Sequence, residues 1–224
     1  MIRRGGEQRI PRPPLARGGR PAPWSAIPPD ERPFGLDVIR TACGRLPAPN
    51  RHLMRVPGIR AAAVLMPFFE RHGEAVVVLT KRPDHMPSHR GEIAFPGGKR
   101  DDTDPDLRFT ALREAHEEIG LDPDDVEVVG EMEPYGTLSS RFAIVPFVGL
   151  LAAPPRYVAD TNEVDRILEV PVSELLADGA HHEERWGIGP VDRPVHFFEL
   201  EDETVWGATA GMLARFLTHV LEVR

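Results

Sequence analysis

The sequence predicts a mixed α/β protein, in which a mixed β-sheet lies between helices as an α/β/α sandwich. Two observations predict this class. Hydrophobic residues make up 41% of the 224 residues, which is enough for a substantial core. Strand-like and helix-like segments also follow one another without the regular alternation that is typical of a parallel sheet. We therefore expect strands of both orientations within one sheet.

The chain is expected to have three parts. Residues 1–33 are rich in Arg, Pro and Gly and lack apolar periodicity, so they should form a disordered or extended arm. Residues 34–58 should form a helical N-terminal extension, because Leu36 and Ile39 follow helical spacing. The remaining residues, 59–224, carry the pattern of a globular domain.

Within the domain, apolar runs predict strands and helical periodicity predicts helices. The predicted strands are residues 61–66, 75–82, 126–132, 142–151, 164–170 and 195–200. The predicted helices are residues 107–119, residues 171–178 and a C-terminal helix with Leu213, Phe216, Leu217, Val220 and Leu221 on one face. Pro171 is expected at the first helical position of its helix, where a missing N–H costs no hydrogen bond.

Composition excludes several classes of function. The formal net charge is −8, which disfavours bulk attraction to nucleic acid or to an acidic membrane. No apolar run reaches the roughly 18 residues needed to span a bilayer, and the N-terminus lacks the apolar core of a secretory signal. Cys43 is the one cysteine, so no internal disulfide can form; we expect it to be a small buried residue. These features predict a cytoplasmic protein.

The most informative stretch is FPGGKRDDTDPDLRFTALREAHEEIGL, residues 95–121. On a helix, Glu114, Glu117 and Glu118 fall within an arc of about 100°. Carboxylates this close repel one another, and a divalent cation would offset the repulsion. A solvated acidic face is the alternative interpretation of the helix alone.

A glycine turn precedes this acidic helix. Gly97 and Gly98 can adopt backbone angles that other residues avoid, and they allow backbone groups to approach a ligand or metal closely. Pro96 stiffens the entry to the turn. Together the turn and the helix predict a site in which a cation bridges phosphate oxygens and activates water.

Residues 97–121 resemble the Nudix box, G-x5-E-x7-R-E-U-x-E-E-x-G-U, where U is aliphatic. The matching residues are Gly98, Arg113, Glu114, Glu117, Glu118, Gly120 and Leu121, with Ala115 at an aliphatic position. The chain departs from the pattern in the loop half, where one extra residue separates Gly98 from Arg113 and Asp104 best matches the first acid.

The resemblance extends upstream, where LTKRPDHMPSHRGEIAFPGGKRD (79–101) is similar to the extra signature of the coenzyme A pyrophosphatase branch. The matching residues are Leu79, Thr80, Arg82, His89, Gly91, Phe95, Pro96, Gly97 and Gly98. Pro83, Met86 and Pro87 depart from that signature, and Arg90 is expected to compensate for the arginine that Pro87 replaces. VWGATAGML (205–213) also resembles this branch.

The resemblance implies a Nudix fold and a hydrolase of a diphosphate linkage that uses Mg²⁺ or Mn²⁺. Glu114, Glu117, Glu118 and the Gly97 carbonyl would ligate the metal, and Arg113 would hold a glutamate in place. Glu163 is a further candidate ligand or general base, with a solvated loop acid as the alternative. Coenzyme A would be cleaved to adenosine 3′,5′-bisphosphate and 4′-phosphopantetheine. The side chains expected to bind this anionic substrate, beside the backbone of Gly98, are Arg82, His89, Arg90 and Lys99.

Several alternatives stay open. The substrate could instead be ADP-ribose, NADH or a nucleoside triphosphate. A further hypothesis is that the protein is a non-catalytic nucleotide-sensing module. The protein could form a homodimer. His181 and His182 lack metal-site spacing and are expected on the surface, whereas Trp206 is expected in the core.

Overall fold

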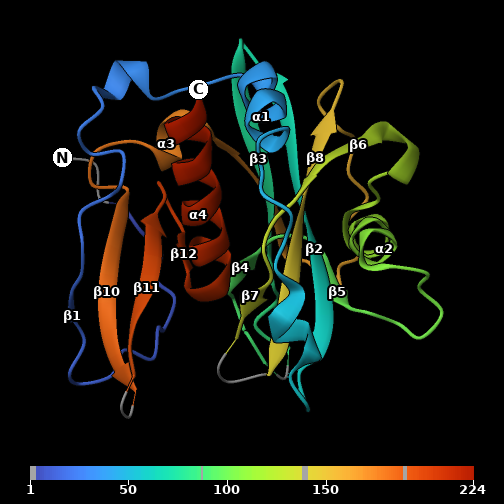
Figure 1. The fold of residues 1–224 in the computed structure, drawn as a ribbon, viewed down its shortest axis with the longest axis horizontal. Helices are drawn as coiled ribbons and strands as arrows, with labels where there is room; N and C mark the ends of the chain where they lie inside the picture. The colour runs from blue at the N-terminus through green and yellow to red at the C-terminus, as the bar shows by residue number, and fades with distance from the viewer. Residues whose placement is uncertain (1–3, 87, 138–140, 189–190) are drawn as a thin grey trace.

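The computed structural model describes residues 4–86, 88–137, 141–188 and 191–224. Pro87, one of the departures from the coenzyme A signature, lies outside the described residues. Within them the strands form one sheet of eight strands and one of four. Figure 1 shows the layers in order: helix α2 (Leu107–Ile119), the large sheet, helix α4 (Gly207–Val223) with α1 (Leu36–Cys43), and the small sheet.

The large sheet is mixed, as expected. Its strands are β2 (Arg60–Arg71), β3 (Glu74–Lys81), β4 (Ile93–Ala94), β5 (Gly97–Lys99), β6 (Val126–Glu131), β7 (Tyr135–Gly136), β8 (Phe142–Leu151) and β9 (Arg166–Pro171). The main path is β4-β3-β2-β8-β6, with β5 paired to β2, β7 to β8 and β9 to β3. Only β2 and β8 run parallel among these pairs of the described chain. The predicted α/β/α sandwich is confirmed.

Alternation along β2 builds a separate core on each face of the large sheet. Val64 and Met66 pack with α4, whereas Ala63 and Leu65 pack with α2. Side chains on successive strand residues point to opposite faces, so a continuous apolar run is buried on both sides. The short helix α3 (Val172–Leu175) begins one residue later than predicted: Pro171 is its N-cap and the last residue of β9.

The small sheet is an addition that the sequence did not predict as a unit. Its strands are β1 (Arg17–Gly18), β10 (His181–Ile188), β11 (Val191–Glu199) and β12 (Thr204–Trp206), all antiparallel. Of these, only part of β11 was expected. The prediction that His181 lies on the surface is wrong, because β10 buries it against Trp24 and Phe198, while His182 is half-buried and stacks on Phe197.

The N-terminal arm follows an extended course along the small sheet from residue 4 onward. The Gly5 N–H donates to the Leu200 carbonyl at 2.7 Å, and β1 pairs with β10. Trp24 is 2% exposed, and buried Arg32 donates to the Leu176 carbonyl at 2.7 Å. The division of the chain into three parts stays a prediction.

Short 3₁₀ turns complete the described structure. They are η1 (Pro29–Glu31), η2 (Arg51–Arg55) and η3 (Pro123–Asp125). Cys43, at the end of α1, is buried as predicted. None of the helices formed by the described residues has the length and apolar character needed to cross a membrane.

Candidate functional site

The glycine turn brings the large sheet against the acidic helix. In β5, Gly97 pairs with Val64 and Gly98 pairs with Ala63. A Cβ atom on Gly97 would collide with the Ala63 carbonyl oxygen, and one on Gly98 would collide with the carboxylate of Glu114. At Gly97 only glycine lets β5 lie against the backbone of β2, whereas a side chain at Gly98 would displace the Glu114 carboxylate.

Local signals delimit the acidic helix. The Asp106 carboxylate accepts a hydrogen bond from the Phe109 N–H at 2.8 Å and so caps the first turn of α2. Gly120 ends the helix with a left-handed φ of 70°. Between these caps, the buried face carries Ala111 and Ala115, which leaves the glutamates along the flank that faces β5 and the loops.

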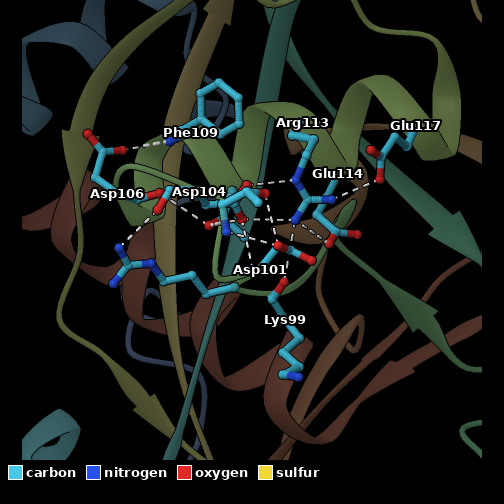
Figure 2. A network of polar contacts seen from close by, with 11 residues as sticks. Lys99, Asp101, Asp104, Asp106, Phe109, Arg113, Glu114 and Glu117 are labelled. Carbon is cyan, nitrogen blue, oxygen red and sulfur yellow. Dashed lines mark hydrogen bonds and ion pairs between the residues drawn. The ribbon is translucent and has the colours of Figure 1, made fainter.

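Asp104 and Arg113 form the centre of the polar network in Figure 2. Arg113 Nε lies 2.9 Å from Asp104 Oδ1 and Arg113 Nη2 lies 3.0 Å from Asp104 Oδ2, so the contact is bidentate. Asp104 is 2% exposed and also accepts hydrogen bonds from Thr110 Oγ1 and the Asp101 N–H. The Arg113 hydrogen bonds hold the pKa of the Asp104 carboxyl well below its usual range.

Arg113 also contacts two of the three glutamates. It donates to Glu114 Oε1 at 2.9 Å and to Glu117 Oε2 at 2.8 Å. Figure 2 shows the guanidinium between Asp104 and these carboxylates. Since Asp104 fixes one edge of the guanidinium, the remaining N–H groups are aimed at the glutamates. In this structure Arg113 therefore contacts Glu114 and Glu117, and its role in the reaction stays a prediction.

Glu118 is the most deeply buried of the three glutamates. It is 5% exposed, and the Gly97 N–H donates to its Oε2 at 3.2 Å. Burial raises the pKa of Glu118 to about 8, with Glu114 and then Glu163 adding repulsion, against the Gly97 hydrogen bond and the charge of Arg82. Burial also raises the pKa of Glu114. A buried carboxylate beside a half-buried one is costly unless cations compensate both, and Arg113 pairs with Glu114 and not with Glu118.

The loop after β8 places Glu163 near this pair. The Asp160 N–H donates to the Glu118 carbonyl at 2.9 Å, and the Val158 N–H donates to the Ile119 carbonyl at 2.9 Å. These bonds tie the loop to the end of α2. Glu163 is exposed, and its charge is among the contributions that raise the pKa of Glu114 and Glu118 after burial.

The donor set fits a hard divalent cation in chemistry, though it is not assembled as a cluster. Within the described ranges, no three or more His, Cys, Asp or Glu side chains converge closely enough to hold a metal ion. Glu117 is paired with Arg113 and its side chain is 58% exposed. Glu114 and Glu118 present carboxylate oxygens beside the glycine backbone, which are the ligands that Mg²⁺ and Mn²⁺ prefer.

A cavity of about 600 Å³ adjoins the glycine turn. The lining residues that the sequence singled out for substrate or metal are Arg82, His89, Gly97, Gly98 and Lys99. Arg82 Nε is buried and has no hydrogen-bond partner among the described atoms. The His89 ring pairs with Glu92 at 2.9 Å. Arg90 is exposed, bonds to the Met86 carbonyl at 2.7 Å and does not line the cavity formed by the described residues.

The small sheet and α4 supply a second wall that sequence reasoning missed. Trp186 of β10 lines the cavity beside Trp206 of β12, with ring centroids 6.0 Å apart. Tyr135 of β7 also lines it. Trp206 is half-buried and open to the cavity, which differs from the expectation that it packs in the core. An aromatic residue within a charged run, such as Trp186 in HHEERWGI, was the sequence signal that could have predicted this wall.

Known proteins resemble this chain in sequence and in fold. The NUDIX domain model matches residues 59–189. The chain is 38% identical over 154 residues to "Uncharacterized Nudix hydrolase NudL" of Enterobacter sp. (strain 638), covering 69% of this chain and 79% of the relative. It is 35% identical over 161 residues to the protein of the same name in Yersinia pestis (strain Pestoides F), covering 72% and 80%. A MutT/nudix family protein from Enterococcus faecalis aligns with a TM-score of 0.50 at 15% identity, over 80% of this chain and 66% of that one, and shows likeness of fold.

Proposed function

Since the chain belongs to the Nudix family and is a hydrolase of a pyrophosphate linkage, we propose that its preferred substrates are coenzyme A and its acyl thioesters. The products would be adenosine 3′,5′-bisphosphate and 4′-phosphopantetheine or its acylated form. A cytoplasmic location and a homodimer both stay predictions.

One observation carries the substrate proposal. The two stretches that resemble the coenzyme A branch, 79–101 and 205–213, are far apart in the chain, yet both line the same cavity. Arg82, His89 and Gly97 come from the first stretch, and Trp206 and Met212 come from the second. A shared role in binding one substrate explains why both stretches resemble the same branch.

We propose that Mg²⁺ or Mn²⁺ binds to Glu114, Glu117 and Glu118 with the Gly97 carbonyl. When bound, such a cation supplies Lewis acidity for the diphosphate and lowers the pKa of a water molecule. Glu117 pairs with Arg113 in this structure, so its use as a ligand exchanges an ion pair for a metal bond. The raised pKa values of Glu114 and Glu118 support the proposal, because a cation would relieve the repulsion that contributes to them.

The cationic side chains of the cavity would bind and orient the phosphates. Arg82 has a buried Nε without a partner, and a phosphate oxygen would satisfy it. Lys99 and His89 line the same cavity. The backbone of Gly98 can approach a phosphate closely because it carries no side chain. Arg90 lies outside the lining, so its predicted contact requires the substrate to extend beyond the cavity.

Glu163 is the proposed general base. Its carboxylate is exposed, on a loop that two backbone hydrogen bonds tie to the end of α2. From there it could accept the proton of the attacking water while Glu114 and Glu118 hold the metal. ADP-ribose, NADH and nucleoside triphosphates are the alternative substrates, favoured by Pro87, which leaves the coenzyme A signature of residues 79–91 incomplete.

The test is a substrate panel with the purified full chain in Mg²⁺ or Mn²⁺. The panel contains coenzyme A, acetyl-coenzyme A, ADP-ribose, NADH and nucleoside triphosphates, and mass spectrometry identifies the products. We expect the highest kcat/KM for coenzyme A compounds, with adenosine 3′,5′-bisphosphate released. A higher kcat/KM for any other member of the panel would replace the substrate proposal. Glu118→Gln serves as the matched inactive control for contaminating hydrolases.

A further inference from the structure

The first turn of helix α4 opens into the cavity beside the small sheet. Gly207, Ala208 and Thr209 begin this helix, and all three line the cavity. No side chain of the described residues caps this end of α4, and its first turn carries no acidic residue. The first N–H groups of a helix have no partner within the helix and carry partial positive charge, so they attract anions. The start of α4 therefore presents hydrogen-bond donors to a ligand in the cavity.

Thr209 is a buried polar side chain that points to such a ligand. It is 8% exposed and lines the cavity, and its hydroxyl has no hydrogen-bond partner among the residues that the structure describes. Thr218, further along the same helix, instead donates to the Ala214 carbonyl at 2.8 Å. Buried hydroxyl groups are normally hydrogen-bonded, so Thr209 indicates that a polar atom of a ligand completes this side of the cavity.

Arg193 of β11 brings a full positive charge to the same side. It lines the cavity, is exposed and forms no ion pair within the described part of the chain, whereas Arg185 pairs with Asp192. The Tyr135 phenol also lines the cavity. Burial raises the pKa of Tyr135, and the charges of Arg215 and Arg193 oppose this rise. Two arginines thus act on one hydroxyl group in a chain whose net charge is −8.

We propose that the first turn of α4, the Thr209 hydroxyl and Arg193 form a second phosphate site, which binds a phosphate monoester of the substrate apart from its diphosphate. The inference rests on the proposed function, because on a coenzyme A derivative this group is the 3′-phosphate of the ribose. A phosphate monoester carries a charge of about −1.5 to −2 near pH 7 and three acceptor oxygens. These oxygens match the helix N–H groups, the hydroxyl and the planar guanidinium.

A neutral nucleobase is the alternative occupant of this side. Trp186 and Trp206 offer aromatic faces, and the Thr209 and Tyr135 hydroxyls can bond to the edge of a base. A base alone, however, would leave the Arg193 charge and the helix end without a counter-charge. A phosphate monoester compensates both, and the base that carries it can still lie against the aromatic faces. The two occupants are distinguished by a substrate that keeps the base and lacks the extra phosphate.

The proposal predicts that the wild type prefers coenzyme A to 3′-dephospho-coenzyme A. Hydrogen bonds between charged groups should give coenzyme A about a tenfold higher kcat/KM, at the lower end of their usual range because Arg193 is exposed. The 3′-phosphate takes no part in bond cleavage, so the difference should lie in KM and not in kcat.

Substitutions at the second phosphate site should remove this preference. Arg193→Gln loses the charge, and Thr209→Val loses the hydroxyl, so in both variants the loss should fall mainly on coenzyme A. Arg193→Lys keeps the charge without the planar fork and should retain part of the preference. Arg20→Gln is the matched control, because Arg20 is an exposed arginine of the arm and lies outside the lining formed by the described residues.

Binding of the products gives a readout that does not depend on turnover. Isothermal titration calorimetry of the wild type should give adenosine 3′,5′-bisphosphate about a tenfold lower Kd than adenosine 5′-monophosphate. Arg193→Gln should bring the two Kd values together, and Arg20→Gln should keep them apart. Since Arg193 is exposed, its substitution should leave the Tm unchanged, which checks that the variant is folded.

The outcomes separate this inference from the proposed function. A preference for coenzyme A that Arg193→Gln removes and Arg20→Gln retains supports the second phosphate site. Equal kcat/KM values for coenzyme A and 3′-dephospho-coenzyme A in the wild type would overturn the inference and leave the proposed function standing. Equal losses on both substrates in Arg193→Gln would also overturn it, because Arg193 would then contact a group that both contain, such as the base or the diphosphate. Failure to hydrolyse either compound, with ADP-ribose or NADH cleaved instead, would overturn both.

Discussion

Arg113 and Asp104 are joined by two parallel hydrogen bonds of 2.9 and 3.0 Å, and the carboxylate is almost completely buried. Thr110 Oγ1 and the Asp101 N–H also donate to Asp104 Oδ2, which fixes the orientation of the carboxylate. Arg113 is thereby held in one orientation, from which it reaches Glu114 and Glu117. The loop half of the box, where the sequence departs from the family pattern, thus positions the helix half, which we propose binds the metal.

Asp104→Asn should reduce both stability and turnover. The substitution keeps the shape but replaces a charged bidentate acceptor, so we expect a loss of about 3 kcal/mol in the free energy of unfolding. Turnover should fall about tenfold or more because Arg113 no longer holds Glu114. Urea unfolding and kcat measure the two effects. Asp102→Asn, at an exposed position in the same loop, is the control. Equal behaviour of the two variants would contradict the role given to Asp104.

Glu118→Gln should abolish turnover without loss of stability. Burial raises the pKa of Glu118 to about 8, so without metal the charged form is disfavoured in the folded state. A group with a raised folded pKa destabilises the protein as pH rises above its unfolded value. Glu118→Gln removes that charge, so in EDTA at pH 8 its Tm should match or exceed that of the wild type, while kcat falls by about 10² or more. A near-normal kcat would remove Glu118 from the metal site.

Addition of Mg²⁺ or Mn²⁺ should raise the Tm of the wild type. A ligand that binds only the folded state stabilises it by RT ln(1 + [L]/Kd), which is about 2.7 kcal/mol when the ligand is at one hundred times its Kd. The shift should be largely absent in Glu118→Gln and reduced in Glu117→Gln. Differential scanning fluorimetry in EDTA and in increasing Mn²⁺ measures it. An identical shift in all three proteins would place the metal elsewhere.

The small sheet should lose stability in mild acid because of His181. Burial, followed by repulsion from His196 and His182, lowers the pKa of His181 to about 3. The unfolded state, with an ordinary histidine, binds the proton first, so stability is complete above about pH 6.5 and falls by up to about 1.4 kcal/mol per pH unit below it. Urea unfolding from pH 7 to pH 4 should show a shallower decline for His181→Phe than for the wild type. The exposed His85 provides a control, since His85→Ala should leave the slope unchanged.

The arm should be required for stability from Trp24 onward. Trp24 is buried against His181 and Phe198, and Arg32 donates to the Leu176 carbonyl and to Asp178. Trp24→Ala should cost about 3–5 kcal/mol in the free energy of unfolding. Leu15→Ala is the matched control, because Leu15 is 79% exposed on the same arm. A small effect of Trp24→Ala would mean that the segment is only loosely attached to the small sheet.

The acidic helix and the main strands could be predicted from the sequence because their signals are local. Helical spacing placed Glu114 and Glu118 on one flank of α2, and continuous apolar runs predicted β2, β3 and β8. Caps at Asp106 and Gly120 delimit α2 within the same short stretch. Each of these signals depends on neighbours within a few residues, so the printed sequence contains it.

Only the tertiary structure decided how Asp104, Trp186 and His181 are used. Asp104 lies in a run of acidic residues that looks solvated. It is nevertheless buried, because Arg113 of α2 donates hydrogen bonds to its carboxylate. Trp186 lies in the charged strand β10, where it is buried and donates to Glu184, a side chain that Arg12 of the arm also contacts. The sequence by itself therefore determined the family, the reaction class and the acidic helix. Long-range pairing, which no local spacing encodes, decided the second sheet and the cavity that it lines.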